Sequence, residues 1–221
     1  MKNLHNALLL KQLYQLKNLG FNYTEVQAYS YDDHKLLELP NDLQALQQQA
    51  QNCHLCSLSK NRNHVVFGEG NPHARLMFIG DKPLEIEDNA GQPFLGRGGE
   101  MLTAMIEKVI GLSRNEVYIT NLLKCHPLAN KVVHESEFHT CKAYLFKEIE
   151  LVKPEVIVTL GEEAYHYLSN DTTPLSKIRG SHISKENYAL IPTYHPNFLL
   201  KNPSLKKEVF LDLQKVQKLL V

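Results

Sequence analysis

From residue 74 onward, short runs of consecutive hydrophobic residues alternate with longer segments in which hydrophobic residues recur at helical spacing. The runs predict buried strands at residues 74–80, 117–121, 154–161 and 189–193, with an edge strand near 181–185. The longer segments predict helices at residues 99–110, 141–152, 162–168 and 205–220. Because strands alternate with helices, the pattern predicts an α/β fold with a parallel sheet covered on both faces.

The first part of the chain follows a different pattern. Residues 4–18 have the spacing of an amphipathic helix that ends near Gly20, and residues 21–40 are mixed and polar. A second helix is predicted to begin near Asn41 or Asp42 and to reach Cys53. We therefore expect a helical and irregular extension over residues 1–44 and one α/β domain over residues 45–221.

Several residues able to do chemistry fall where predicted strands end. Gly80, Asn121, Gly161 and His195 each close or follow a strand. In parallel sheets the carboxyl ends of the strands meet at one edge, and ligands bind in the crevice there. The sequence therefore predicts a site at this edge, although these positions alone do not say what it binds.

Composition excludes several classes of protein. The 221 residues are 43% hydrophobic and 22% charged, which excludes disorder as the main state. Basic and acidic residues each number 24, so only a local excess, such as five lysines against Glu208 and Asp212 in residues 196–221, could attract a polyanion. No apolar run approaches the roughly 18 residues of a spanning helix and no signal-peptide pattern is present, so we expect a cytoplasmic protein without a membrane partner.

The four cysteines stand at Cys53, Cys56, Cys125 and Cys141, too few for a disulfide scaffold in a chain of this length. Two thiolates two residues apart, as at Cys53 and Cys56, can bind one metal centre. Structural zinc usually takes two such pairs, whereas an iron–sulfur cluster can gather distant cysteines. Spacing alone leaves zinc, a [4Fe-4S] cluster and simple burial in the core open.

Residues 80–88 read as an acidic turn, and we expect the aromatic Phe94 beyond it to be exposed. Such a pair could bind a flat polar ring, although a solvated turn with a packed phenylalanine is the commoner arrangement. Asn121 could equally be a cap, and His195 a satisfied buried histidine. These signals gain weight because all of them are predicted on the same rim of the sheet.

Seven segments occur in a specific order and spacing: Gln51–Cys56, Val66–Pro72, Gly91–Gly96, Val117–Cys125, Ile178–Gly180, His195–Pro196 and Leu199–Pro203. Together they resemble the iron–sulfur, family-four branch of the uracil-DNA glycosylase superfamily, and the resemblance extends from about residue 45 to residue 219.

This resemblance implies a three-layer α/β/α sandwich with a central, mostly parallel sheet. It implies that Cys53, Cys56, Cys125 and Cys141 ligate a [4Fe-4S] cluster with a structural role. It also implies a DNA-repair enzyme that hydrolyses the N-glycosidic bond of deoxyuridine, releases uracil and leaves an abasic site. The expected partner is uracil-containing DNA, and we expect a monomer.

The resemblance also assigns roles to residues. Those expected to contact the substrate are Asp81, Lys82, Pro83, Phe94, Asn121 and His195, and those expected to contact DNA phosphates are Arg179, Lys201, Asn202 and Ser204. The flipped base would stack on Phe94 and hydrogen-bond to Asn121. The catalytic pair would be His195, which donates to a carbonyl oxygen of the base, and Asp81, which stabilises the sugar cation and orients water.

Two segments depart from the family pattern. The family motif usually reads Gly-Glu-Ala/Gly-Pro-Gly, where this chain has Gly80-Asp81-Lys82-Pro83-Leu84. The Arg-Pro-Pro that usually follows the third cysteine is replaced by His126-Pro127-Leu128. Aspartate is one methylene shorter than glutamate, so the carboxylate of Asp81 reaches less far toward the attacking water. This leaves two alternatives open. The protein could be a catalytically impaired or altered-specificity iron–sulfur DNA-binding protein of the same fold, or Glu85 or Glu87 could supply the working acid.

Overall fold

The structure, a computed structural model, describes residues 39–128 and 133–220. The predicted helix at 4–18 lies outside these residues. The chain divides into two units, residues 1–38 and residues 39–221, and the second unit contains every element described below. The expected domain boundary at residue 44 stays a prediction.

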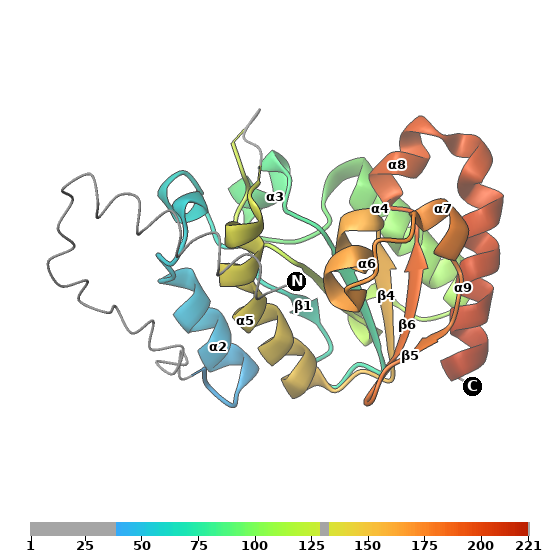
Figure 1. Ribbon diagram of the computed structural model, residues 1–221, viewed down its shortest axis with the longest axis horizontal. Helices are drawn as coiled ribbons and strands as arrows, with labels where there is room; N and C mark the ends of the chain where they lie inside the picture. The colour runs from blue at the N-terminus through green and yellow to red at the C-terminus, as the bar shows by residue number, and fades with distance from the viewer. Residues whose placement is uncertain (1–38, 129–132, 221) are drawn as a thin grey trace, which may run out of the picture. The chain divides into compact units, whose positions relative to one another are not determined.

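The second unit is built on a six-stranded sheet in the order β1-β3-β2-β4-β6-β5 (Figure 1). The strands are β1 (Glu69–Gly70), β2 (Leu76–Gly80), β3 (Tyr118–Asn121), β4 (Val156–Leu160), β5 (Ile183–Ser184) and β6 (Ala189–Thr193). The four inner strands are parallel, and the short edge strands β1 and β5 are antiparallel to their neighbours. The predicted α/β class with a mostly parallel sheet is confirmed.

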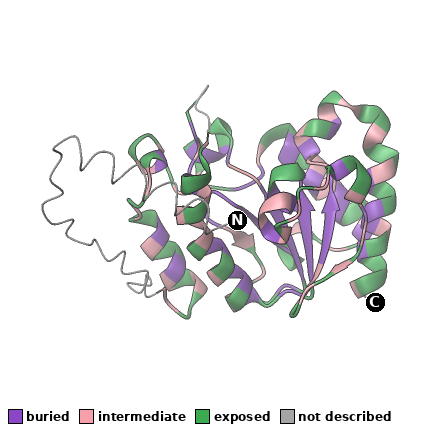
Figure 2. Cartoon of the chain, in the orientation of Figure 1, coloured by how far each residue is buried: buried purple, intermediate pink, exposed green. Residues whose placement is uncertain are grey.

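The inner strands are buried on both faces, as Figure 2 shows. Phe78 of β2 pairs with Ile119 of β3 and with Val158 of β4, and Val158 pairs with Ile191 of β6. Such continuous hydrophobic runs are typical of parallel strands covered by helices. These runs place Gly80, Asn121 and Thr193 at the same, carboxyl edge of the sheet.

Helices cover both faces and produce three layers. The helical elements are α2 (Leu43–Gln51), η1 (Ser57–Lys60), α3 (Glu85–Ala90), α4 (Gly96–Met105), η2 (Ile106–Ile110), η3 (Arg114–Glu116), α5 (Glu135–Val152), α6 (Glu162–Ser169), α7 (Leu175–Ile178), α8 (Pro196–Lys201), η4 (Pro203–Leu205) and α9 (Lys206–Leu220). One core packs α4, η2 and α9 against Phe78 and Val158. The other packs α5 and α6 against Met77 and Ile157. No helix among the described residues is long and apolar enough to cross a membrane.

Three local predictions differ from the structure. The second half of the expected acidic turn, from Glu85 onward, belongs to the helix α3, where the side chain of Glu87 accepts from the N–H of the N-cap residue Leu84. Phe94 is not exposed but buried, with 4% of its surface accessible. The helix carrying Cys141 begins at Glu135 rather than at the cysteine itself. Cys141 therefore lies inside the first half of a long helix, which fixes its direction.

Candidate active site and cysteine cluster

The carboxyl edge of the sheet bounds a cavity of about 310 Å³. Its lining includes most of the residues that the sequence places at the site: Asp81, Lys82, Leu84, Glu87, Phe94, Asn121, His195, Asn197, Phe198 and Lys201. Of the predicted substrate residues only Pro83 does not line this cavity, so strand-end segments that are far apart in sequence meet in one place.

Asn121 closes β3 with its side chain buried, and only 1% of the residue is accessible. Within the described residues neither its Oδ1 nor its Nδ2 has a hydrogen-bond partner. A Cβ at Gly80 would lie 2.4 Å from Asn121 Oδ1 and 2.6 Å from Phe94 Cζ, so only glycine leaves room for both side chains. A buried amide without a partner costs about 1–3 kcal/mol, so its retention points to a ligand that supplies the missing bonds.

The ring of Phe94 is held in place by its own backbone. Phe94 has φ +54°, a left-handed conformation that is rare for a bulky residue. Its carbonyl accepts from Arg114 Nη2 at 3.3 Å, and a Cβ at Gly99 would lie 1.8 Å from that carbonyl oxygen. The ring is stacked on that of His195, with centroids 5.6 Å apart and planes 25° apart. These contacts hold the strained backbone in place, and the ring of Phe94 lines the cavity.

His195 is the N-cap of α8, and this position sets its tautomer. Its Nδ1 accepts a hydrogen bond from the backbone N–H of Asn197 at 3.1 Å. The proton of the neutral ring is therefore on Nε2, which lies 3.9 Å from Asp81 Oδ1. Burial lowers the pKa of His195, and the nearby Asp81 opposes this effect. The site thus holds a neutral imidazole with an N–H directed toward the Asp81 side of the cavity.

A second cavity of about 590 Å³ adjoins the first and shares Asp81, His195 and Phe198 with it. It also contains Glu163, a residue that the sequence-based reasoning missed. Burial, together with the charge of the nearby Asp81, raises the pKa of Glu163. The available signal was the acidic pair that directly follows Gly161 at the end of β4.

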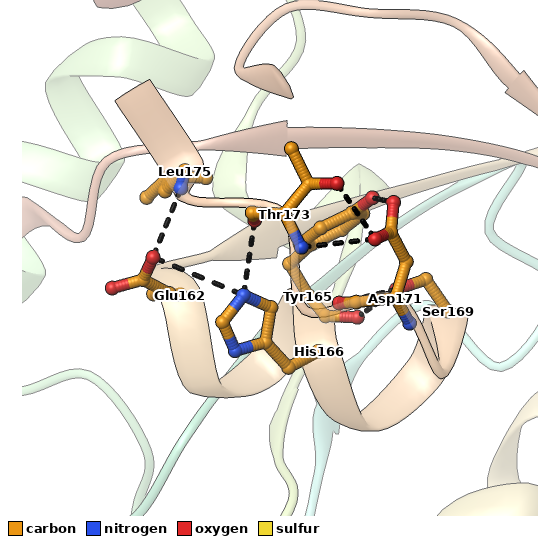
Figure 3. A network of polar contacts seen from close by, with 7 residues as sticks. All are labelled: Glu162, Tyr165, His166, Ser169, Asp171, Thr173 and Leu175. Atoms are coloured by element: carbon orange, nitrogen blue, oxygen red, sulfur yellow. Dashed lines mark hydrogen bonds and ion pairs between the residues drawn. The ribbon is translucent and has the colours of Figure 1, made fainter. Parts of the chain in front are cut away.

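The wall of this second cavity is held by a polar network between α6 and α7 (Figure 3). Glu162 Oε1 accepts from Leu175 N–H at 3.0 Å. Asp171 accepts from Thr173 N–H at 2.9 Å and from the Tyr165 hydroxyl at 2.5 Å. These hydrogen bonds, that of Tyr165 first, lower the pKa of Asp171 to about 2. The network fixes α7 and the turn before it.

The loop after β2 is also held in place by hydrogen bonds. The carbonyl of Pro83 accepts from His126 Nδ1 at 2.8 Å, so the histidine that departs from the family pattern holds this loop. Glu87 accepts from the N–H groups of Leu84 at 2.8 Å and Leu95 at 3.1 Å. Glu87 lines the cavity of about 310 Å³, but both of its carboxylate oxygens accept from these backbone N–H groups, whereas Glu85 is exposed. Asp81 remains the carboxylate closest to His195.

The residues expected to meet DNA phosphates fall into two groups. Lys201 lines the first cavity, and Asn202 and Ser204 follow it at the junction of α8 and η4. Arg179 is different, because its guanidinium pairs with Asp212 at 2.9 Å and with Glu208 at 3.3 Å. A phosphate contact by Arg179 would have to compete with these carboxylates.

All four cysteines line one further cavity, together with Arg62, Lys124 and Tyr144. Arg62 Nη1 donates to Cys125 Sγ at 3.4 Å. Burial raises the pKa of Cys125, and it raises that of Cys141 to about 12. Among the described residues no group of three or more His, Cys, Asp or Glu side chains is spaced to hold a single metal ion.

A buried polar network lies between the cysteines and the cavity of about 310 Å³. Lys124 Nζ donates to Glu148, to Thr120 Oγ1 at 2.6 Å and to the Asn121 carbonyl at 2.9 Å. Glu148 also accepts from the Tyr118 hydroxyl at 3.1 Å, from Thr120 Oγ1 at 3.2 Å and from Gly68 N–H at 3.1 Å. The side chains of Lys124 and Glu148 are 3% and 0% exposed. We call this set the Lys124–Glu148 network.

Comparison with known proteins identifies the family. Residues 67–214 match the uracil DNA glycosylase superfamily. The chain is 36% identical over 189 residues to the type-4 uracil-DNA glycosylase of Sulfurisphaera tokodaii, covering 82% of this chain and 86% of that protein. It is 38% identical over 188 residues to the type-4 enzyme of Saccharolobus solfataricus, with 81% and 87% covered. It is 36% identical over 179 residues to that of Thermotoga maritima, with 79% and 93% covered.

The chain therefore belongs to the uracil DNA glycosylase superfamily. The predicted family, its fold and the enzyme class of a uracil-DNA glycosylase are confirmed by these matches. Nothing in the comparisons favours the alternative of an impaired binding protein.

Proposed function

We propose that this protein hydrolyses the N-glycosidic bond of deoxyuridine in DNA, releasing uracil and leaving an abasic site. The observation that carries the proposal is the buried amide of Asn121, which has no partner among the described residues and shares a cavity with Phe94 and His195. Uracil is a flat ring with a donor–acceptor edge, and it supplies the bonds that this amide lacks.

The first step is base binding. The target atom is inside the DNA stack, so the nucleotide has to be flipped out before the bond can be reached. Phe94 gives the base a stacking face, and its contacts with Arg114, Gly99 and His195 hold it in place. Asn121 reads the base edge through both a donor and an acceptor, and Lys82 lines the cavity from the loop after β2. Pro83 does not line the cavity, but its carbonyl accepts from His126 and so helps to hold this loop.

The second step is bond cleavage. The bond between C1′ and the base nitrogen breaks, and its electron pair stays with uracil while positive charge develops on the sugar. The neutral His195 donates its Nε2–H to a carbonyl oxygen of the base, where negative charge grows. Asp81 stabilises the sugar cation and orients a water molecule, whose oxygen bonds to C1′. The water gives up one proton to solvent, and uracil takes one up.

The four cysteines are the candidate ligands of a [4Fe-4S] cluster. They come from three segments, the stretch after α2, the loop after β3 and the helix α5, and all of them line one cavity. An iron–sulfur cluster can be held by cysteines from distant segments in this way. When bound, the cluster would crosslink these segments, and Arg62, which donates to Cys125 Sγ, would offset part of its negative charge.

The remaining expectations belong to this proposal as well. The partner is uracil-containing DNA, with Lys201, Asn202, Ser204 and Arg179 as candidate phosphate contacts. We also propose a monomeric, cytoplasmic protein in which residues 1–44 form an extension to the catalytic domain.

A single experiment tests the activity. The purified protein is incubated with an oligonucleotide that contains one deoxyuridine, and alkali then cleaves any abasic site. We expect strand cleavage at the uracil and none in the matched thymine oligonucleotide. Binding of uracil-containing DNA without base release would instead favour the impaired-protein alternative. Iron and sulfide content of the same preparation tests the cluster, and one bound zinc without iron would contradict it.

A further inference from the structure

Asp81 is not the only carboxyl group in the second cavity. Glu163, from the first turn of α6, lines the same 590 Å³ cavity as Asp81 and His195. Two neighbouring carboxyl groups can hydrogen-bond to each other only when one of them carries a proton, because two carboxylates would repel each other. A hydrogen bond between Asp81 and Glu163 therefore requires one shared proton.

The surroundings decide which carboxyl keeps the proton. Burial and the charge of Asp81 raise the pKa of Glu163, and Lys82 opposes them. The other ionisable groups near the pair are His195, whose Nε2 lies 3.9 Å from Asp81, and Glu162 on the same turn of α6, whose carboxylate is turned to Leu175 N–H. Glu162 adds negative charge to this side of the cleft. The raised pKa of Glu163 makes it the member that is favoured to carry the proton.

We propose that Glu163 is a positioning residue for Asp81: it donates a hydrogen bond to the Asp81 carboxylate and holds it in the orientation that receives the attacking water. This inference rests on the proposed function and deepens it. The family motif usually carries a glutamate where this chain has Asp81. A shorter carboxylate has fewer orientations that reach the water, and a donor fixed on α6 selects among them.

The proposal has a definite pH dependence. Glu163 has a raised pKa, so its proton persists above the usual range of a glutamate and is lost as the pH rises through that value. Loss of the proton removes the hydrogen bond and leaves two neighbouring carboxylates. The rate of uracil release should therefore fall on the alkaline side. His195 sets the acid side, because its neutral form is the donor and its pKa is lowered.

The test compares pH profiles of uracil release, measured under single-turnover conditions, for the wild type and two variants of full-length protein. Glu163→Gln keeps a donor that does not titrate. It should stay near the wild-type plateau rate and lose the alkaline decline. Glu163→Ala should be about tenfold slower at the plateau, as for one lost hydrogen bond. Glu162→Gln is the matched control, and its profile should keep the alkaline decline.

The outcomes separate this inference from the proposed function. If the wild type releases no uracil, the proposed function fails and the inference falls with it. If the wild type is active and Glu163→Gln keeps the alkaline decline, the function stands and the role of Glu163 is overturned. The same holds if Glu163→Ala equals the wild type at the plateau, or if Glu163→Gln is as slow as Glu163→Ala.

Discussion

Two buried polar sites lie at the end of β3, three residues apart in the chain, and they differ in one respect. In the Lys124–Glu148 network, Lys124 donates to three acceptors and Glu148 receives four donors. At Asn121, neither atom of the side-chain amide has a partner among the described residues. The two sites even share an atom, because the carbonyl of Asn121 accepts from Lys124.

The difference separates stability from function. A buried network that is fully satisfied is self-sufficient, and breaking it leaves uncompensated charge in the core. A buried amide that is unsatisfied lowers stability and gains its bonds only when a ligand enters. The Lys124–Glu148 network therefore acts as the fixed support from which Asn121 presents its amide to the cavity. The four predictions below test this distinction, beginning with the largest effect.

Glu148→Ala should cost the most stability. It leaves the ammonium of Lys124 buried without its counter-ion, and breaking a buried pair in this way costs about 3–5 kcal/mol. Urea unfolding of the purified protein measures this loss. Glu155→Ala is the control, because it breaks an exposed pair with Arg75 and should change stability little. The double variant Lys124→Met/Glu148→Leu should recover much of the loss. Equal effects of Glu148→Ala and Glu155→Ala would contradict the comparison.

Asn121→Leu should have the opposite profile. Leucine has a similar volume and no unsatisfied amide, so the free energy of unfolding should stay the same or rise. Uracil release should slow by about 10²-fold, because the base loses its edge contacts in a buried site. Single-turnover assays, with enzyme in excess and quenched at fixed times, measure the rate of uracil release. Urea unfolding measures the stability. A variant that loses stability but keeps its activity would show that Asn121 is structural.

The sequence predicts some parts of this arrangement and not others. The inner strands could be located because four or five consecutive buried residues give an unmistakable pattern, and the strand ends then placed Gly80, Asn121 and His195 near one another. Helices α3 and α8 could not be located, because six residues are too few to show helical periodicity. The resemblance supplied roles for residues, but it gave no indication of Glu163.

The burial of individual side chains also could not be predicted from the sequence. Phe94 follows a polar, proline-containing stretch and was expected to be exposed, yet it is buried because Gly99 lets its backbone approach α4 closely. Arg179 was expected to be available to DNA, but Asp212 and Glu208 on α9 lie beside it. In both cases the decisive neighbour is set by tertiary packing, which no local pattern contains.

A third prediction concerns the acid limb of uracil release. His195 is active as the neutral ring, and burial lowers its pKa from the usual value of about 6.5. Release should therefore persist below that pH and fall only as the pH drops through the lowered value. A pH–rate profile for the wild type measures this limb. Asp81→Asn removes the charge that opposes the shift, so any residual activity should extend to still lower pH. An acid limb at or above the usual histidine value would contradict a buried neutral ring.

The smallest effect extends the comparison to charged residues at the surface. Lys201 forms no ion pair among the described residues, whereas Arg179 is neutralised by Asp212 and Glu208. A cation free to meet phosphate releases counter-ions from DNA, so Lys201→Gln should reduce the slope of log K against log salt by about 1. Arg179→Gln should change that slope less and lower the thermal stability more, because it removes the guanidinium that pairs with the buried Asp212. Fluorescence anisotropy with an abasic oligonucleotide at several salt concentrations measures both slopes. A larger change for Arg179→Gln than for Lys201→Gln would mean that Arg179 leaves its carboxylates when DNA binds, and that an ion pair in the free protein does not exclude a phosphate contact.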